Sequence, residues 1–292
     1  MNPRDFPFFI VDVFAENKYE GNQLAVFTES HHISSDEMAA IARETNFSET
    51  TFITRVDAPN SSADVRIFTP GGEIPFAGHP TLGTAYVVNK LFLGNTASRV
   101  VLNMKVGSIP MEIEDELLWM TQVQPEFGNE IDKEIIAEVL NISVLDILPN
   151  FPVLPVSTGL CFYIVPLANL DVLKSIRFNS HKAQALLSGK KTKEILVFTP
   201  EGYNNADDLA CRVFVPTMGI PEDPATGSAN GCLAAYLLKE NFFNKNEIDI
   251  QVGQGYEINR PSRLYHKSLR DKGTYTIKVG GKVQDVARGY WD

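Results

Sequence analysis

The chain repeats itself once, at an offset of 146 residues in a total length of 292. Five residues of the first half recur unchanged at this spacing: Arg66, Phe68, Pro70, Pro75 and Gly107 return as Arg212, Phe214, Pro216, Pro221 and Gly253. Further matches are displaced by one or two positions: Glu49 with Glu194, His79-Pro80 with Asp223-Pro224, and Gly83 with Gly227. Isolated coincidences carry no weight, but an ordered series at half the chain length indicates a duplicated unit.

The same order of elements runs through both halves. Apolar and alternating runs predict strands at residues 8–14, 23–27, 49–54, 64–68 and within 100–122. Helical patterns cover residues 34–46, where Ser34 or Ser35 can cap the N-terminus, and residues 84–93 and 131–141. The sequence predicts an α+β chain of two similar domains, 1–127 and 128–292, whose last strand is able to pair with the N-terminal half.

Composition narrows the class of protein. The formal net charge is −10, with 26 basic and 36 acidic residues, which argues against nucleic acid and anionic membrane surfaces as partners. The three cysteines form no CxxC pair, the adjacent His31 and His32 do not share a helix face, and the common zinc and nucleotide motifs are absent. The start of the chain lacks signal-peptide features. We therefore expect a soluble cytoplasmic protein without a bound metal.

Two matching loops, FAGHPTLGTA and EDPATGSANG, are the first candidates for a functional site. In each loop a polar residue and a proline precede small residues that leave backbone N–H groups uncovered at the start of a helix, where an anion binds well. Because pockets prefer domain interfaces, loops from two related halves can close on one ligand. The alternative for Asp223 is a simple helix cap, and for His79 a hydrogen-bonded structural histidine.

Glu49 is the candidate for acid–base chemistry. It opens an apolar strand in the segment NFSETTFI, with Phe47 and Phe52 nearby. Partial desolvation would raise the pKa of such a carboxyl toward the useful range. The alternative is a solvated turn glutamate like its neighbour Glu44.

Three segments together carry a resemblance that spans nearly the whole chain. NFSETTFI, RIFTPGGEIPFAGHPTLGTA and RVFVPTMGIPEDPATGSANG resemble the PhzF-like family of phenazine biosynthesis proteins, which has the diaminopimelate epimerase-like fold. The resemblance implies two domains, each a β-sheet wrapped around a central helix, with the active site in the cleft between them. It also implies Glu49 as the proton shuttle, with His79 and Asp223 assisting the transfer. Gly78, Gly227, Ser228 and Ala229 would bind the substrate.

The resemblance implies an isomerase that needs no cofactor and acts on a small carboxylate by shifting a double bond. Epimerases of this fold use two opposed thiols, and neither loop here contains a cysteine, while Cys232 lies inside the following helix. Two alternatives remain open: an epimerase or racemase of a small carboxylic acid, and a non-catalytic binding or interaction protein that retains the cleft. The resemblance is compatible with a homodimer, although the sequence shows no interface. The physiological substrate and a link to phenazine production stay open.

Overall fold

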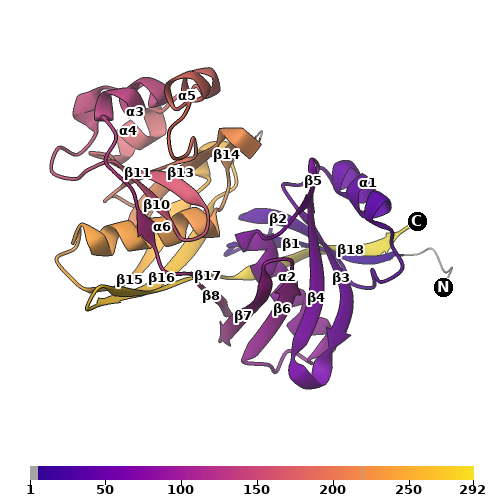
Figure 1. Cartoon of the computed structure of the whole chain (residues 1–292). Coiled ribbons are helices and arrows are strands. Elements are labelled where there is room, and N and C mark those ends of the chain that lie inside the picture. The colour runs from indigo at the N-terminus through magenta and orange to yellow at the C-terminus, as the bar shows by residue number, and fades with distance from the viewer. Residues whose placement is uncertain (1–5, 219) are drawn as a thin grey trace. The chain divides into compact units, whose positions relative to one another are not determined.

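The computed structural model describes residues 6–218 and 220–292, so the first five residues of the segment examined for signal-peptide features lie outside the described residues. The chain divides into two compact units (Figure 1). The first contains residues 1–120 and 280–292, and the second contains residues 121–279. Among the described residues, no helix is long and apolar enough to cross a membrane.

The described part of the first unit contains two α-helices and most of the N-terminal strands. Its helices are α1 (Ser35–Thr45) and α2 (Gly78–Phe92). Its strands are β1 (Phe6–Val13), β2 (Asn22–Phe27), β3 (Thr50–Asp57), β4 (Ser62–Thr69), β5 (Gly72–Ile74), β6 (Arg99–Met104), β7 (Gly107–Glu114), β8 (Leu117–Thr121) and β18 (Val283–Trp291). A short 3-10 turn, η1, covers Ala58–Asn60.

The described part of the second unit contains four further α-helices. They are α3 (Lys133–Leu140), α4 (Leu170–Ser175), α5 (Ser180–Leu186) and α6 (Gly227–Lys239). Its strands are β9 (Glu126–Phe127), β10 (Leu154–Ser157), β11 (Cys161–Pro166), β12 (Ile195–Thr199), β13 (Leu209–Val215), β14 (Ile220–Asp223), β15 (Glu247–Gln254), β16 (Ser262–Asp271) and β17 (Thr274–Gly281). The 3-10 turns are η2 (Val144–Asp146), η3 (Pro216–Met218) and η4 (Tyr256–Ile258).

Strand pairing repeats between the units, as the sequence offset predicts. In the first unit β2 is parallel to β3, β3 is antiparallel to β4, and β4 is parallel to β6. In the second unit β11, β12, β13 and β15 pair in the same senses. The registers also agree, because Thr50 faces Phe68 and Ile195 faces Phe214. The duplication is therefore present in the hydrogen-bond ladder as well as in the residue matches.

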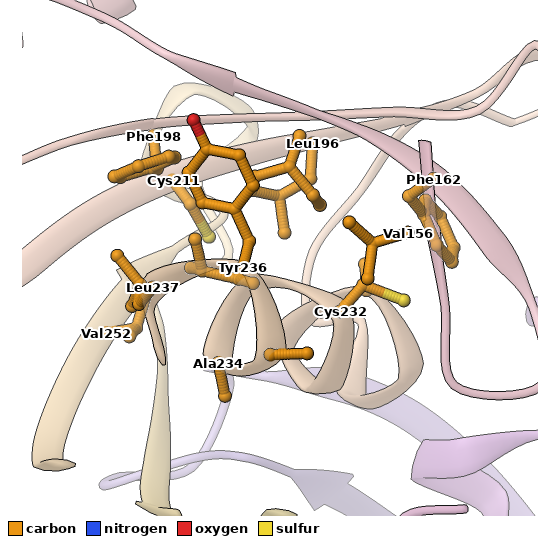
Figure 2. Packing of buried hydrophobic residues seen from close by; sticks show 14 of the residues in the cluster. Val156, Phe162, Leu196, Phe198, Cys211, Cys232, Ala234, Tyr236, Leu237 and Val252 are labelled. Atoms are coloured by element: carbon orange, nitrogen blue, oxygen red, sulfur yellow. The ribbon is translucent and has the colours of Figure 1, made fainter. Parts of the chain in front are cut away.

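Each unit encloses one helix against its sheet. Helix α2 packs on β1, β2, β3 and β6, and α6 packs on β10, β11, β15 and β16. Every residue of α6 from Gly227 to Leu238 is buried. Figure 2 shows Cys232, Ala234, Tyr236 and Leu237 of this helix within the apolar cluster. A helix that is apolar on all sides is stable only when it is surrounded, so the strands must wrap around it. The sheet wrapped around a central helix, expected from the resemblance, is confirmed in both units.

Helix α2 begins six residues earlier than the pattern predicts. The segment FAGHPTLGTA is predicted to be a loop that leads into a helix at residue 84, but α2 already starts within this segment, at Gly78. Pro80 is tolerated there because a first-turn residue donates no intrahelical hydrogen bond. A Cβ on Gly83 would lie 2.6 Å from Leu24 Cδ2 and 2.8 Å from Val13 Cγ2, so Gly83 permits close contact with the strands. Close packing, rather than loop formation, explains this glycine.

The observed units differ from the predicted domains, 1–127 and 128–292, at both boundaries of the second unit. The chain leaves the first unit after Met120 and returns to it at Gly280. Strand β18 then pairs antiparallel with β1, and Trp291 packs on Phe8 and Phe27. The reason is that β1 has two hydrogen-bonding edges. Strand β2 covers one edge, and β18, from the other end of the chain, covers the opposite edge.

Candidate active site

Glu49 and His79 lie against each other in the first unit. Helix α1 ends at Asn46 in a left-handed conformation (φ 52°), and the chain then leads through residues 47–48 into β3. Glu49 directly precedes β3, and His79 is the second residue of α2. The side chains are 13% and 7% exposed, and His79 Nε2 lies 3.5 Å from Glu49 Oε2. The desolvation expected for Glu49 is therefore present, and its neighbour is an imidazole.

His79 is a neutral imidazole whose tautomer is set by the backbone. Burial lowers the pKa of His79 to about 3, although a hydrogen bond with the backbone of Gln23 acts in the opposite direction. Among the described residues Nε2 makes no hydrogen bond within normal geometry, so the bond to Gln23 comes from Nδ1. A bond that favours the protonated ring is one in which Nδ1–H donates to the Gln23 carbonyl. The lone pair on Nε2 therefore faces the Glu49 carboxyl.

Asp223 of the second unit corresponds in the sequence repeat to His79 of the first unit. It ends β14, is 8% exposed, and accepts a hydrogen bond on Oδ2 from the Thr226 hydroxyl. The residue that caps α6 is Thr226, three positions later, and its side chain makes no cap hydrogen bond. The capping alternative for Asp223 is therefore wrong, because the chain makes an extra turn through residues 224–226 before the helix begins.

Helices α2 and α6 both begin without a side-chain cap. Their N-cap residues are Ala77 and Thr226, and the first intrahelical bonds come from the Thr81 and Asn230 N–H groups. Gly78 therefore opens α2, while Gly227, Ser228 and Ala229 form the first turn of α6. Uncapped N–H groups and the helix dipole favour an anion at such an end. The two prolines occupy different positions: Pro80 is the third residue of α2, whereas Pro224 lies outside α6.

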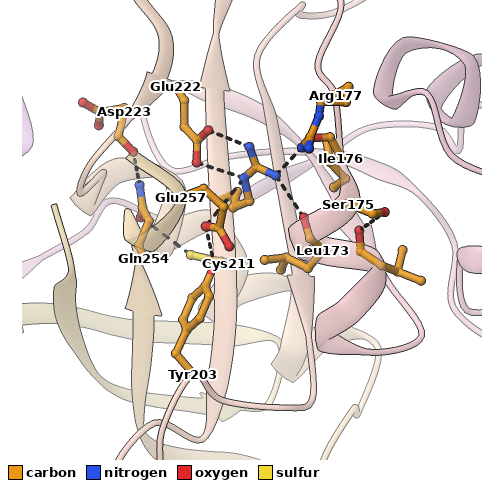
Figure 3. A network of polar contacts seen from close by, with 12 residues as sticks. Leu173, Ser175, Ile176, Arg177, Tyr203, Cys211, Glu222, Asp223, Gln254 and Glu257 are labelled. Atoms are coloured by element: carbon orange, nitrogen blue, oxygen red, sulfur yellow. Dashed lines mark hydrogen bonds and ion pairs between the residues drawn. The ribbon is translucent and has the colours of Figure 1, made fainter. Parts of the chain in front are cut away.

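Thr226 and Gln254 join Asp223 in a buried polar network that the sequence motifs did not predict. Figure 3 shows the bond from Gln254 to the Asp223 carbonyl. Gln254 is fully buried at the end of β15. Its Nε2 donates to the Asp223 carbonyl at 2.8 Å and to Thr226 Oγ1 at 3.1 Å. The sequence contains a pattern that indicates Gln254. Buried apolar residues alternate along β15 at Ile248, Ile250 and Val252, and Gln254 continues this inward-facing series. A polar residue at an inward position requires buried partners.

Buried histidines make folding stability depend on pH. Burial lowers the pKa values of His79 and His266 to about 3, below the ordinary value of 6.5. Between these values the unfolded chain binds protons that the folded chain does not, so stability falls as the pH is lowered from about 6.5 toward 3. The expected loss is up to about 1.4 kcal/mol per pH unit for each histidine.

Urea unfolding at pH 7.5, 6 and 5 measures this loss. His266→Gln can keep a hydrogen bond to Asn230, which the His266 ring makes at 3.1 Å, and should roughly halve the dependence on pH. The raised pKa of Glu194, caused by burial, acts in the opposite sense and is common to both proteins. An equally steep pH dependence in the variant would contradict this assignment.

The cysteines are packing residues rather than acids or bases. Cys211 and Cys232 are fully buried in the cluster around α6 (Figure 2). Burial raises the pKa of Cys232 to about 12, and it also raises the pKa of Cys211 and of the half-buried Cys161. A thiol must lose its proton to act as a base, so none of the three is prepared for that role at neutral pH. Within residues 6–218 and 220–292, no three His, Cys, Asp or Glu side chains form a metal-binding group.

Comparison with known proteins identifies the family. Residues 11–289 match the PhzC-PhzF family, described as phenazine biosynthesis-like proteins. The chain belongs to the PhzC-PhzF family. It is 33% identical to an uncharacterized isomerase of Clostridium acetobutylicum over 96% of each chain. It is 32% identical to the trans-2,3-dihydro-3-hydroxyanthranilate isomerase of Pseudomonas chlororaphis, over 97% of this chain and 98% of the relative.

Structural comparison agrees with the PhzF assignment. The PhzF-family phenazine biosynthesis protein of Bacillus anthracis superimposes with a TM-score of 0.90 at 26% identity, covering 99% of both chains. The diaminopimelate epimerase-like fold expected from the sequence is thereby confirmed. The chain is an isomerase of the PhzF family.

Proposed function

We propose that this isomerase moves a proton between two carbons of a small carboxylate, with Glu49 as base and then as acid. The observation that carries the proposal is the buried Glu49 carboxyl, 3.5 Å from the Nε2 atom of His79. A desolvated carboxylate is a stronger base than one in water, because bulk water does not stabilise its charge. Such a group can take a weakly acidic proton and later return it. One residue is then enough for both proton transfers.

The proton transfer takes place in two steps, and the substrate is neither oxidised nor reduced. The Glu49 carboxylate removes a proton from a carbon next to an unsaturated, carboxylated system, and the electron pair of the broken C–H bond spreads into that system. The new Glu49 O–H can donate to the lone pair on His79 Nε2. A different carbon of the same system then takes the proton back, and the double bond has moved. His79 holds the proton-bearing carboxyl and, being neutral with Nδ1 committed to Gln23, does not itself act as the acid.

The carboxylate of the substrate would bind where positive charge is available. The first turn of α6 offers the N–H groups of Gly227, Ser228 and Ala229, and Gly78 begins the uncapped α2. Asp223 would hold a polar, hydrogen-bond-donating group on the same molecule. In this proposal the reaction needs no cofactor.

Proton NMR in D₂O with trans-2,3-dihydro-3-hydroxyanthranilate, the compound in the name of the Pseudomonas relative, tests the proposal. We expect isomerisation with deuterium incorporated at the carbon that receives the proton. An unchanged substrate spectrum would remove this compound as the substrate. A panel of other small unsaturated carboxylates would then test the reaction class, and no exchange with any member would contradict the proposal.

The alternative functions give different results in the same assay. An epimerase would cause loss of optical activity without a change in the ultraviolet spectrum, whereas a double-bond shift changes the spectrum. A binding protein would be thermally stabilised by the ligand but would not exchange protons. The raised thiol pKa values argue against an epimerase that uses two cysteines.

A further inference from the structure

We propose that Gln254 is a positioning residue that acts through Thr226 to hold Asp223 as a hydrogen-bond acceptor toward the protein. The inference deepens the proposed function and rests on it, because it concerns the state in which Asp223 meets the substrate. Neither Gln254 nor Thr226 needs to touch the reacting atoms for this role.

The orientation of the Gln254 amide is determined by backbone groups. The Thr226 N–H can only donate, and it lies 3.3 Å from Gln254 Oε1. The Asp223 carbonyl can only accept, and it lies 2.8 Å from Gln254 Nε2. Exchanging the amide nitrogen and oxygen would place two donors together and two acceptors together, so the assignment is unambiguous. Asn230 Nδ2 donates to Oε1 at 3.0 Å and supports the same orientation.

This orientation directs the proton of the Thr226 hydroxyl. Gln254 Nε2 donates to Thr226 Oγ1 at 3.1 Å, so an oxygen lone pair faces Gln254 and the hydroxyl proton is left for another acceptor. The acceptor is Asp223 Oδ2. A proton on Oδ2 would compete with the hydroxyl proton for the same space, so the arrangement favours Asp223 with an unprotonated Oδ2.

The network is rigid because it is buried and its bonds are shared among several elements. Gln254 and Asn230 are fully buried, and Asn230 Oδ1 lies 3.1 Å from His266 Nε2. The amide of Asn230 also donates to the Thr226 carbonyl at 3.1 Å. The end of β14, the start of α6 and the end of β15 are therefore tied together, and rotation of Thr226 would break more than one bond.

In the described part of the first unit, the place of Gln254 is taken by a side chain without an N–H donor. Asp64 faces Asn103 of β6 as Ala210 faces Gly253 of β15, so the residue matching Gln254 is Met104, whose sulfur lies 3.8 Å from Thr81 Oγ1. The duplicated halves thus differ in chemistry. One unit places a carboxyl beside a neutral imidazole that can hold its proton, and the other presents a hydroxyl proton to a carboxylate. We infer that Glu49 carries the moving proton while Asp223 keeps Oδ2 as a hydrogen-bond acceptor.

Thr226→Val tests the relay, because it removes the hydroxyl and keeps the side-chain shape. We expect kcat to fall about 10- to 100-fold with a smaller change in KM, and Thr226→Ser, which keeps the hydroxyl, should recover most of the loss. Thr192→Val is the matched control: it removes a hydroxyl that bonds the Cys161 carbonyl at 2.9 Å, elsewhere in the same unit, and should leave kcat unchanged. Equal kcat values for the Val and Ser variants at position 226 would overturn the proposal.

A second readout does not depend on turnover. The ¹³C NMR signal of the Asp223 carboxyl is followed against pH in the folded wild type and in Thr226→Val. We expect the titration midpoint to rise by about one pH unit when the donor is lost. The surrounding charges stay the same in both proteins: Glu222 and Glu257, both paired with Arg212.

An unchanged midpoint contradicts the relay even if the enzyme is active. A shifted midpoint in a protein that exchanges no substrate proton supports the relay while the proposed function fails. Gln254→Glu is a stricter variant, since it loses both N–H donors at nearly constant volume. We expect it to reproduce the midpoint shift of Thr226→Val, and a midpoint like that of the wild type would count against the role of Gln254. If this buried charge prevents folding, the Thr226 pair still decides the question.

Discussion

Glu49→Gln should lower kcat by about 10³-fold. The amide is too weak a base to take a proton from carbon and too weak an acid to return one. The substitution keeps size and shape, so binding of the substrate should change little. Stability should be retained, since a neutral amide is less costly to bury than a charge. The measurement is turnover in D₂O together with deuterium incorporation, and both should be lost.

Glu44→Gln is the control for this prediction. Glu44 lies on the exposed face of α1, five residues before Glu49, and the same chemical change there should leave turnover intact. Activity of Glu49→Gln within a few-fold of the wild type would remove Glu49 from the mechanism. Another group would then have to supply the base, and His79, whose Nε2 lone pair faces the same space, would be the next candidate.

Arg212→Ala should destabilise the protein by about 3–5 kcal/mol, because it leaves buried carboxylates without their cation. Arg212 is 6% exposed and bonds both oxygens of Glu222, at 2.9 and 2.7 Å. Its Nη1 donates to the Leu173 and Ile176 carbonyls at the end of α4 (Figure 3). The substitution therefore leaves the Glu222 carboxylate without its cation and also removes the donor to the carbonyls at the end of α4.

The duplication supplies a matched control in Arg66→Ala. Arg66 makes the same two-bond pair with Glu73 and, like Arg212, lies over a phenylalanine ring two residues ahead. Its side chain is 29% exposed, and Lys105 also contacts Glu73 at 2.7 Å. We expect a loss of about 1 kcal/mol, typical of an ion pair near solvent.

Two optical probes separate the effects of these substitutions. Both tryptophans, Trp119 and Trp291, belong to the first unit, so fluorescence follows that unit while far-ultraviolet circular dichroism follows the whole chain. In urea, Arg212→Ala should shift the dichroism transition more than Arg66→Ala does. Equal losses for the two variants would mean that burial does not decide the strength of these pairs.

The sequence was sufficient for the repeat and the fold class. A repeat offset can be read without coordinates, because related halves conserve the spacing of turn residues and of inward apolar positions. The motifs around Glu49, His79 and Asp223 carry the resemblance to the PhzF-like family, and the roles of these residues stay predictions. Local patterning misplaced the start of α2, since Gly78 and Gly83 resemble a loop until the strands that pack on them are known.

The amino-acid sequence by itself determined which carboxyls and imidazole are available and which helices begin without a cap. Only the tertiary structure decided their chemical states. Burial makes His79 neutral, and a carbonyl from β2 directs its lone pair toward Glu49. Gln254, 31 residues after Asp223, sets the direction of a hydroxyl proton. Desolvation and hydrogen-bond direction depend on groups distant in the chain, so no local pattern of residues can specify them.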